Sequence, residues 1–273
     1  MPGKAQHQSN CICVYNIDIS SGGCPIAIDP KTGEFDRSRE CSYCYAAYVH
    51  RNYIKEKEVN EKEWIKFKNS MTLNVMRIGK NLEPGHKDHR ETLYEVLRLN
   101  NKYELRSILI TKLLEFDKRI VELVKDQRST IHYSMGKESM ETGAVLNGST
   151  NDWRLETAKK YADAGVNTYL RIVEDIAVPM REETKGWCRA GLPVLITPLR
   201  YNSKRALQQY RPDADWDELK SSTSYEYAKG YLKPIIWHSD YEPYKERCGD
   251  VAGKEYCNNC GLGKISRRIL EYA

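Results

Sequence analysis

The sequence predicts an α/β fold in which six parallel strands and their helices form a partial (β/α)6 barrel of the TIM type. Strand-like and helix-like segments alternate regularly from residue 107 onward, which is typical of a parallel sheet with helices outside it. The length of 273 residues suits one large domain of this kind. A cysteine-rich segment follows the first expected strand, at the strand end where barrels place their chemistry.

Period-two alternation and helical spacing place the individual elements. The expected strands are residues 11–19, 71–78, 107–112, 130–135, 166–173 and 192–199. Helices are expected at residues 46–54, 88–101, 116–127 and 182–190, and the charged residues 55–68 are expected to form a solvated helix face. A further helix is expected to be capped by Asn151 and closed by Gly165 in a left-handed conformation. The expected inward-facing residues of the second and third helices are Leu93, Val96, Leu97, Ile120, Leu123 and Val124.

Composition and charge narrow the class of protein. The chain has 43 Lys and Arg against 38 Asp and Glu, and its net charge of +5 is spread over mixed signs. This suits an anionic small molecule or a nucleotide as partner, and stable nucleic-acid binding is not expected. The first ten residues are polar, and no apolar run approaches the roughly 18 residues that span a bilayer. We therefore expect a cytoplasmic protein without a membrane segment, and metal binding explains its nine cysteines better than a disulfide framework does.

Three cysteines near the N-terminus form the main candidate for a metal site. Cys24 follows two glycines that allow a tight loop, and Cys41 and Cys44 follow after a long gap. A structural zinc site uses four protein ligands, whereas three thiolates on a 4Fe-4S cluster leave one iron open to another molecule. The sequence favours the cluster, with a structural zinc site or unrelated buried thiols as the alternatives.

This cysteine segment resembles the cluster loop of the radical S-adenosylmethionine superfamily. That loop usually reads Cys-x3-Cys-x-aromatic-Cys, and Tyr43 stands in the aromatic position. The first gap is longer here, because residues 25–40 separate Cys24 from Cys41, as in some members of the superfamily. The resemblance implies a six-stranded partial barrel, S-adenosylmethionine as cofactor, and an external electron donor of the flavodoxin or ferredoxin type. The inserted residues and the C-terminal residues are then expected to act as lids.

The strand ends resemble the spore photoproduct lyase branch of that superfamily. A Thr-Lys pair closes the third strand of that branch and a serine lies on the fourth, and this chain has Lys112 and Ser134 in those places. The resemblance implies that Lys112 pairs with the carboxylate of the cofactor and that Ser134 adds a hydrogen bond. An ordinary solvent-exposed lysine at a strand end is the alternative.

The fifth and sixth strands supply the remaining candidates for the cofactor site. Arg171 and Glu174 lie on an otherwise apolar strand, where charged residues face a polar cavity or form an ion pair that supports the barrel. The resemblance also implies that Tyr43 lies against the adenine ring and that the backbone around Ile196 reads its edge. The Gly-Gly-Glu pattern that usually ends the second strand is absent, so the contact to the amino group of the cofactor is unassigned.

A second group of cysteines lies beyond the expected barrel. We expect residues 1–200 to form the barrel and residues 201–273 a C-terminal extension that packs on it. Cys248, Cys257 and Cys260 resemble a zinc knuckle without its fourth ligand. This group is interpreted as a zinc site, an auxiliary iron-sulfur cluster, or a set of thiols without metal.

These observations predict a radical S-adenosylmethionine enzyme of the lyase type. The resemblance implies formation of a 5'-deoxyadenosyl radical that breaks a bond in a nucleoside or nucleotide substrate. As a short, single-domain member of this branch, the chain resembles a lyase that releases queuine from queuosine or its monophosphate. The alternatives are a DNA-lesion lyase, a peptide-modifying enzyme with an auxiliary cluster and, without catalysis, a zinc-stabilised binding protein.

Overall fold

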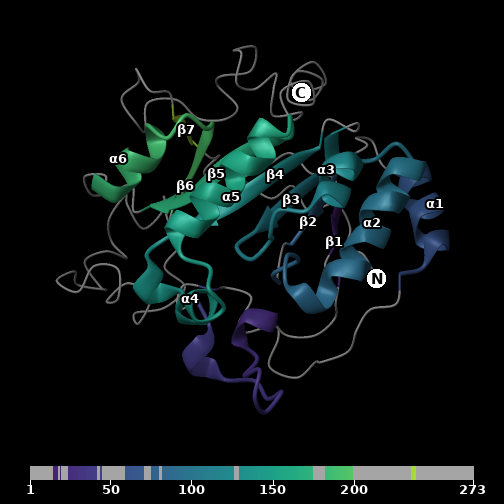
Figure 1. The fold of residues 1–273 in the computed structure, drawn as a ribbon. Coiled ribbons are helices and arrows are strands. Elements are labelled where there is room, and N and C mark those ends of the chain that lie inside the picture. Colours follow the sequence, from purple (N-terminus) through teal and green to yellow (C-terminus); the bar gives the residue numbers. More distant parts are fainter. Residues whose placement is uncertain are drawn as a thin grey trace, which may run out of the picture.

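A computed structural model describes most of the expected barrel. The described residues are 15–17, 19, 24–41, 44, 59–70, 75–79, 82–125, 129–174, 182–198 and 235–237. Seven strands form one sheet in the order β1-β2-β3-β4-β5-β6-β7, in which β1 to β6 are parallel and β7 is antiparallel to β6 (Figure 1). The strands are β1 Tyr15–Ile17, β2 Val75–Ile78, β3 Arg106–Thr111, β4 Thr130–Met135, β5 Asn167–Glu174, β6 Val194–Pro198 and β7 Ile235–Trp237.

Helices connect the parallel strands. The α-helices are α1 Glu61–Ser70, α2 Arg90–Lys102, α3 Lys118–Lys125, α4 Thr142–Leu146, α5 Asn151–Asp163 and α6 Glu182–Cys188. Short 3₁₀ helices are η1 Pro25–Ala27, η2 Arg37–Arg39, η4 Lys87–His89 and η5 Glu138–Met140. The six parallel strands in chain order confirm the predicted α/β partial barrel, because each strand returns beside its predecessor after a crossover. Strand β7 was not expected, since three residues are too few for a periodic pattern.

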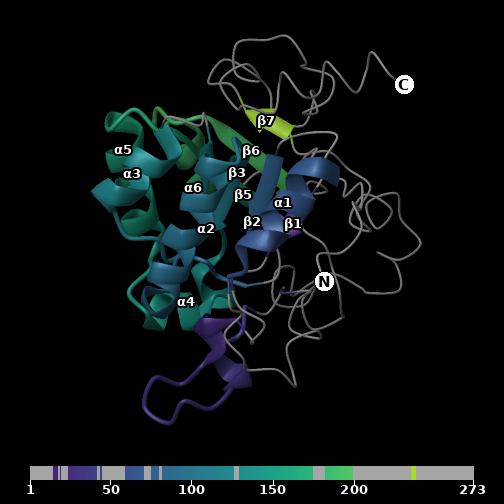
Figure 2. The same ribbon diagram turned by 90° about the vertical axis from the view of Figure 1, so that its right-hand side faces the viewer.

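The helices cover one face of the sheet and bury the main apolar core. Figure 2 shows α2, α3 and α5 on the same side of the strands. The inward positions expected on α2 are confirmed, because Leu93, Val96 and Leu97 are almost fully buried. On α3, Ile120 and Val124 are buried as expected. The core residues that the parallel strands send to this face are Met76, Ile78, Leu109, Ile131, Tyr133, Met135, Leu170, Ile172 and Val194.

The structure corrects two details of the helix predictions. Asn151 does not cap α5, because the hydroxyl of Thr150 accepts the hydrogen bond from the backbone N–H of Trp153 at 3.2 Å. The expected solvated face at residues 55–68 also carries buried residues, since Trp64 and Phe67 of α1 lie in the core. The expected closure at Gly165 is confirmed by its φ of +83°. The helix expected at residues 46–54 lies outside the described residues.

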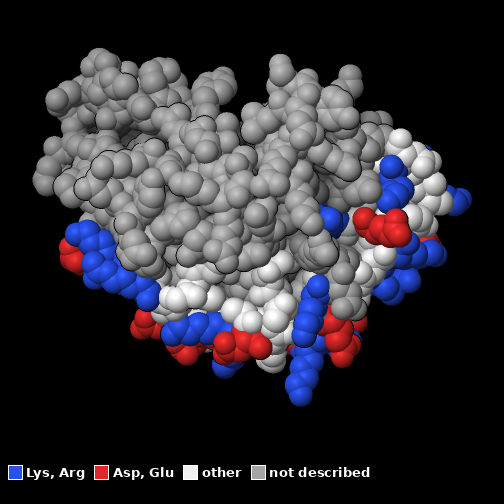
Figure 3. Space-filling model, turned by 90° about the horizontal axis from the view of Figure 1, so that it is seen from above, with Lys and Arg blue, Asp and Glu red and all other residues white. Residues whose placement is uncertain are grey.

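The surface of the described part mixes charges of both signs. Figure 3 shows Lys and Arg side chains interspersed with Asp and Glu side chains on the face seen from above. Within the described residues, no helix combines the length and the apolar character that crossing a membrane requires.

Candidate cofactor site

The residues between the first two cysteines of the motif form a small folded unit. After η1 the chain turns, Ile28 pairs with Phe35 across an antiparallel bridge, and η2 leads back to Cys41. The carboxylate of Asp36 begins η2 by accepting hydrogen bonds from the backbone N–H and the hydroxyl of Ser38, at 2.8 and 2.7 Å. Figure 2 shows this segment in purple beside α4. The insertion therefore has local structure of its own.

A close approach of backbones anchors the insertion to α4. A Cβ placed on Gly143 would lie 2.3 Å from the carbonyl oxygen of Arg39 and 2.5 Å from that of Ile26. Ile26 is buried and packs with Leu113, which follows β3, and with Ala144 of α4. Only glycine allows this contact, because neither backbone oxygen belongs to a flexible side chain.

Gly143→Ala is therefore expected to displace the insertion and to destabilise the protein by about 1–3 kcal/mol through overpacking. Gly186 in α6 is the matched control, because a Cβ there would meet nothing within 4 Å. Gly186→Ala should be neutral or slightly stabilising, since alanine is the better helix former. Urea unfolding of the two variants measures the difference. Equal stabilities would show that the insertion does not depend on this contact.

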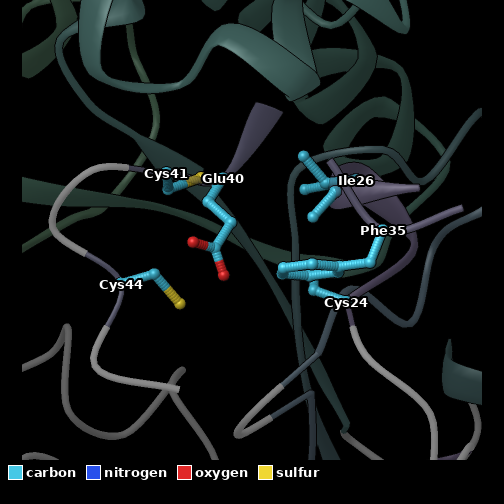
Figure 4. Close-up of a pocket in the computed structure, with 7 residues that line it drawn as sticks. Cys24, Ile26, Phe35, Glu40, Cys41 and Cys44 are labelled. Atoms are coloured by element: carbon cyan, nitrogen blue, oxygen red, sulfur yellow. The ribbon is translucent and has the colours of Figure 1, made fainter. Parts of the chain in front are cut away.

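The three motif cysteines line one pocket. Its lining consists of Cys24, Ile26, Ala27, Phe35, Glu40, Cys41 and Cys44, and its empty volume is about 300 Å³ including the part open to solvent. Figure 4 shows the side chains around this space, with the carboxylate of Glu40 pointing into it. These three cysteines form no disulfide among the described residues, and all three are partly buried. Cys24 packs near Leu113, which follows β3, so the pocket lies at the carboxyl-terminal edge of the parallel strands.

Burial keeps the thiols of Cys24 and Cys41 protonated when no metal is bound. Desolvation raises the pKa of Cys24 well above its usual value, with smaller contributions from the charges of Cys41, Cys44 and Glu83. Burial also raises the pKa of Cys41 to about 12; the charge of Lys112 opposes this rise and that of Glu141 adds to it. Thiolate ligands therefore become favourable in this pocket only beside a positive metal centre.

The raised thiol pKa predicts an alkaline instability of the metal-free protein. The pKa of Cys41 in the folded protein lies above that of an ordinary thiol, so the contribution of this group to the free energy of unfolding is fully present below about pH 9. It is lost as the pH rises toward 12, because only the unfolded chain then ionises freely. Cys41→Ser should show a smaller fall in urea midpoint than the parent between pH 8 and 10.5. If the urea midpoint of Cys41→Ser fell with pH as steeply as that of the parent, this account would be contradicted. Cys188→Ser is the control and should behave like the parent.

A buried ion network lies beside Cys41. Glu141 is fully buried and pairs with Lys112, whose Nζ is 2.8 Å from Oε1, and with Arg154, whose Nη1 is 2.5 Å from Oε2. Arg154 also donates to the carbonyl oxygens of Ser134 and Ser149, at 3.0 and 2.8 Å. The network therefore ties α5 to the ends of β3 and β4. It also holds the ammonium group of Lys112 in place at the predicted cofactor site.

Sequence reasoning missed Glu83, which follows β2 and is also buried. Its carboxylate accepts hydrogen bonds from the backbone N–H groups of Gly85 and Lys112, at 2.8 and 2.6 Å, and from the hydroxyl of Thr111. Burial raises its pKa, and these hydrogen bonds oppose the rise. The available signal was a carboxylate just beyond the carboxyl end of a strand, ahead of Pro84 and Gly85. The carboxylate of Glu83 also contributes to the raised pKa of Cys24.

The other predicted site residues fall into two groups. Ser134 of β4 and Arg171 of β5 are buried and opposite each other in the sheet. Glu174 lies opposite Pro198, and Ile196 lies opposite Ile172. The remaining candidates lie outside the described residues, namely Tyr43, Cys248, Cys257 and Cys260.

The donor set of the pocket fits a 4Fe-4S cluster. Three cysteine side chains line one pocket, and thiolate is the usual ligand of such clusters. Among the described residues, no group of three or more His, Cys, Asp or Glu side chains converges to hold a metal ion. In a four-iron cluster each thiolate binds a different iron, so its three sulfurs lie farther apart than the ligands of a single metal ion. Glu40 supplies a carboxylate to the same pocket.

Comparisons of the whole chain identify its fold. No family model matches the sequence, and no curated protein matches it. A spore photoproduct lyase double mutant with bound AdoMet and dinucleoside spore photoproduct matches with a TM-score of 0.52 and 18% identity, over 100% of this chain and 76% of that one. The chain has the spore photoproduct lyase fold. The predicted resemblance to that radical S-adenosylmethionine branch is thus confirmed at the level of the fold.

Two further structures extend this comparison. A single mutant of spore photoproduct lyase with the dinucleoside matches with a TM-score of 0.52 and 18% identity, over 81% of this chain and 66% of that one. SuiB of Streptococcus suis bound to S-adenosylmethionine gives a TM-score of 0.45 and 15% identity, over 70% of this chain and 45% of that one.

Proposed function

We propose that this chain is a radical S-adenosylmethionine enzyme of the lyase type. The observation that carries the proposal is the pocket in which Cys24, Cys41 and Cys44 meet at the carboxyl end of a partial barrel. These thiols would hold a 4Fe-4S cluster, and Glu40 would lie beside it. The bound cluster supplies the electron that cleaves S-adenosylmethionine into methionine and a 5'-deoxyadenosyl radical. An external donor of the flavodoxin or ferredoxin type would deliver that electron in the cytoplasm.

The residues around the pocket are suited to bind the cofactor. Lys112 is held by Glu141 with its ammonium group at the site, so it is ready to pair with a carboxylate. Ser134 and Arg171 lie opposite each other on the next two strands. The carboxylate of Glu83 accepts three hydrogen bonds and has lone pairs left to accept a further one. We assign Glu83 to the amino group of the cofactor. Tyr43 and the backbone at Ile196 are proposed to contact the adenine ring. Glu174 is a further proposed contact to the cofactor.

The insertion and the neighbouring strands would exclude water from the reaction. The insertion is anchored on α4 by Gly143 and forms one wall of the pocket through Ile26 and Phe35. Apolar walls of this kind protect a reactive radical from solvent. The rigid contact at Gly143 favours a fixed wall over a hinged lid.

A nucleoside or nucleotide is the proposed substrate class. The spore photoproduct lyase structures with this fold contain a dinucleoside, which supports this class. Within it we propose queuosine or its monophosphate, from which bond cleavage would release queuine. A DNA-lesion lyase is the second candidate, favoured by the same bound dinucleoside.

The experiment uses protein purified and reconstituted without oxygen. With a strong reductant and S-adenosylmethionine, it is expected to form methionine and 5'-deoxyadenosine in equal amounts, measured by mass spectrometry. Queuosine monophosphate should then yield free queuine, whereas a DNA photoproduct should remain uncleaved. Absence of 5'-deoxyadenosine from a protein that carries its cluster would refute the enzyme proposal. Formation of 5'-deoxyadenosine without queuine would refute only the queuosine substrate.

The C-terminal extension, residues 201–273, is proposed to pack on the barrel and to carry a metal site of its own. Cys248, Cys257 and Cys260 would hold zinc or an auxiliary iron-sulfur cluster. Metal analysis of Cys257→Ser separates the two, because the variant would lose zinc in the first case and iron in the second. Loss of neither metal would exclude this site.

A further inference from the structure

A closed ring of hydrogen bonds holds Lys112, the residue that follows β3. The Nζ of Lys112 donates to Oε1 of Glu141 at 2.8 Å, and Oε2 of Glu141 accepts from Nη1 of Arg154 at 2.5 Å. The Nε of Arg154 donates to the hydroxyl of Ser149 at 2.8 Å, and that hydroxyl donates to the carbonyl oxygen of Lys112 at 2.5 Å. The ring therefore holds Lys112 both by its backbone and by its ammonium group.

Glu141 is the member of this ring that bears on the ammonium group, and its own position is fixed. Its backbone N–H donates to the carbonyl oxygen of Glu138 at 2.8 Å, and its carbonyl oxygen accepts from the N–H of Ala144 at 2.9 Å. It immediately precedes α4, which carries the contact of Gly143 with the insertion. Its side chain has no exposed surface. A carboxylate that is buried and bound at both oxygens can set the place of the ammonium group of Lys112.

The ring also reaches the second predicted cofactor residue. The Nη1 of Arg154 donates to the backbone carbonyl oxygen of Ser134 at 3.0 Å. Lys112 and Ser134 come side by side on neighbouring strands, because the residues that precede them are paired in the sheet. One carboxylate group of a ligand can contact two side chains so placed. Glu141 and Arg154 link the ammonium group of the first residue to the backbone of the second.

We propose that Glu141 is a positioning residue for the carboxylate end of the cofactor. It places the ammonium group of Lys112 and, through Arg154, fixes the distance of that group from Ser134. This inference rests on the proposed function, in which Lys112 pairs with the carboxylate of S-adenosylmethionine. A lysine has a flexible four-carbon stem and loses rotamer freedom when its ammonium group is bound. Glu141 restricts that freedom before the cofactor arrives, and such preorganisation raises affinity.

Competition between Glu141 and the cofactor for Lys112 would have the opposite effect. If Glu141 mainly competed, removal of its charge would strengthen cofactor binding, whereas removal of a positioning group weakens it. Glu141 divides its two oxygens between Lys112 and Arg154, so it does not bind the ammonium group with both. Positioning is therefore expected to dominate, and the direction of the change in affinity decides between the two effects.

The test compares two ligands of the full reconstituted chain by anaerobic isothermal titration calorimetry. S-adenosylmethionine carries the carboxylate, whereas decarboxylated S-adenosylmethionine lacks it and keeps the amino group and the sulfonium. Glu141→Gln is expected to raise the Kd of the first ligand at least tenfold and that of the second less than twofold. Glu141→Asp keeps the charge but is one methylene shorter, so it should show the same selective loss. Glu156→Gln is the matched control and should change neither Kd, because Glu156 lies exposed on α5 in an ion pair with Lys159.

Three results would overturn the inference. Equal weakening of both ligands in Glu141→Gln would indicate a general structural role. Unchanged or tighter binding of S-adenosylmethionine would exclude positioning. Binding by Glu141→Asp that matches the parent would assign the effect to charge alone.

Two controls keep the outcome clear. Circular dichroism and iron analysis confirm that each variant is folded and carries its cluster. If Glu141→Gln does not fold, Glu141→Asp decides alone: a selective loss for S-adenosylmethionine supports the inference, and binding like that of the parent refutes it. Binding requires no turnover, so a parent that binds S-adenosylmethionine but forms no 5'-deoxyadenosine would refute the proposed function and leave the role of Glu141 intact.

Discussion

Cys41→Ala is expected to lose about four iron atoms per chain relative to the parent and to form no detectable 5'-deoxyadenosine. The reason is that Cys41 supplies one of the three thiols around the pocket, and a 4Fe-4S cluster left with two thiolates is not retained. Iron and sulfide analysis after anaerobic reconstitution measures the loss. Cys24→Ala and Cys44→Ala should behave in the same way.

Two comparisons make this result specific. Cys188→Ala, at the end of α6, should keep the iron content of the parent. Any iron at the C-terminal cysteines should also remain in Cys41→Ala, so the difference between the two proteins reports on the pocket alone. Full iron content in Cys41→Ala would exclude the pocket as the cluster site.

Arg154→Met is expected to lower the free energy of unfolding by about 3–5 kcal/mol. The arginine is fully buried and pairs with Glu141, so its removal takes a neutralising cation away from a buried carboxylate. It also removes the hydrogen bonds to the carbonyl oxygens of Ser134 and Ser149. Urea or guanidinium unfolding measures the change.

An exposed ion pair provides the matched control. Arg98 pairs with Glu95 on α2, and the two side chains are 54% and 41% exposed. Arg98→Met should therefore cost less than about 1 kcal/mol. Similar losses in the two variants would show that the buried network contributes no more than a surface pair. A large loss in Arg154→Met alone would confirm that the network holds the strand ends together.

Local sequence patterns were sufficient to predict the parallel strands. Strand-like segments such as Arg106–Thr111 and Thr130–Met135 are bounded by helical segments, so this alternation indicated a parallel sheet. The cysteine spacing likewise indicated one site, because thiols are few and their chemistry is distinctive. The basic residues at the strand ends were found for the same reason: charge on an apolar strand is rare.

Contacts between distant segments could not be predicted in this way. The docking of Ile26 against Gly143 joins residues more than one hundred positions apart, and glycine carries no signal for a partner. Glu141 and Arg154 were overlooked because charged residues near helices are usually solvated, and their burial depends on tertiary packing. Glu83 belongs to no pattern that periodicity detects.

The central claim is that three thiols hold a cluster whose fourth iron is open to the cofactor. Electron paramagnetic resonance of the reduced, reconstituted protein tests it most directly, with spectra recorded before and after S-adenosylmethionine is added. The account predicts a signal of a reduced 4Fe-4S cluster that changes its g values when the cofactor binds. A cluster whose fourth iron is already held by Glu40 or another side chain would give the same spectrum in both samples, and that result would contradict the account.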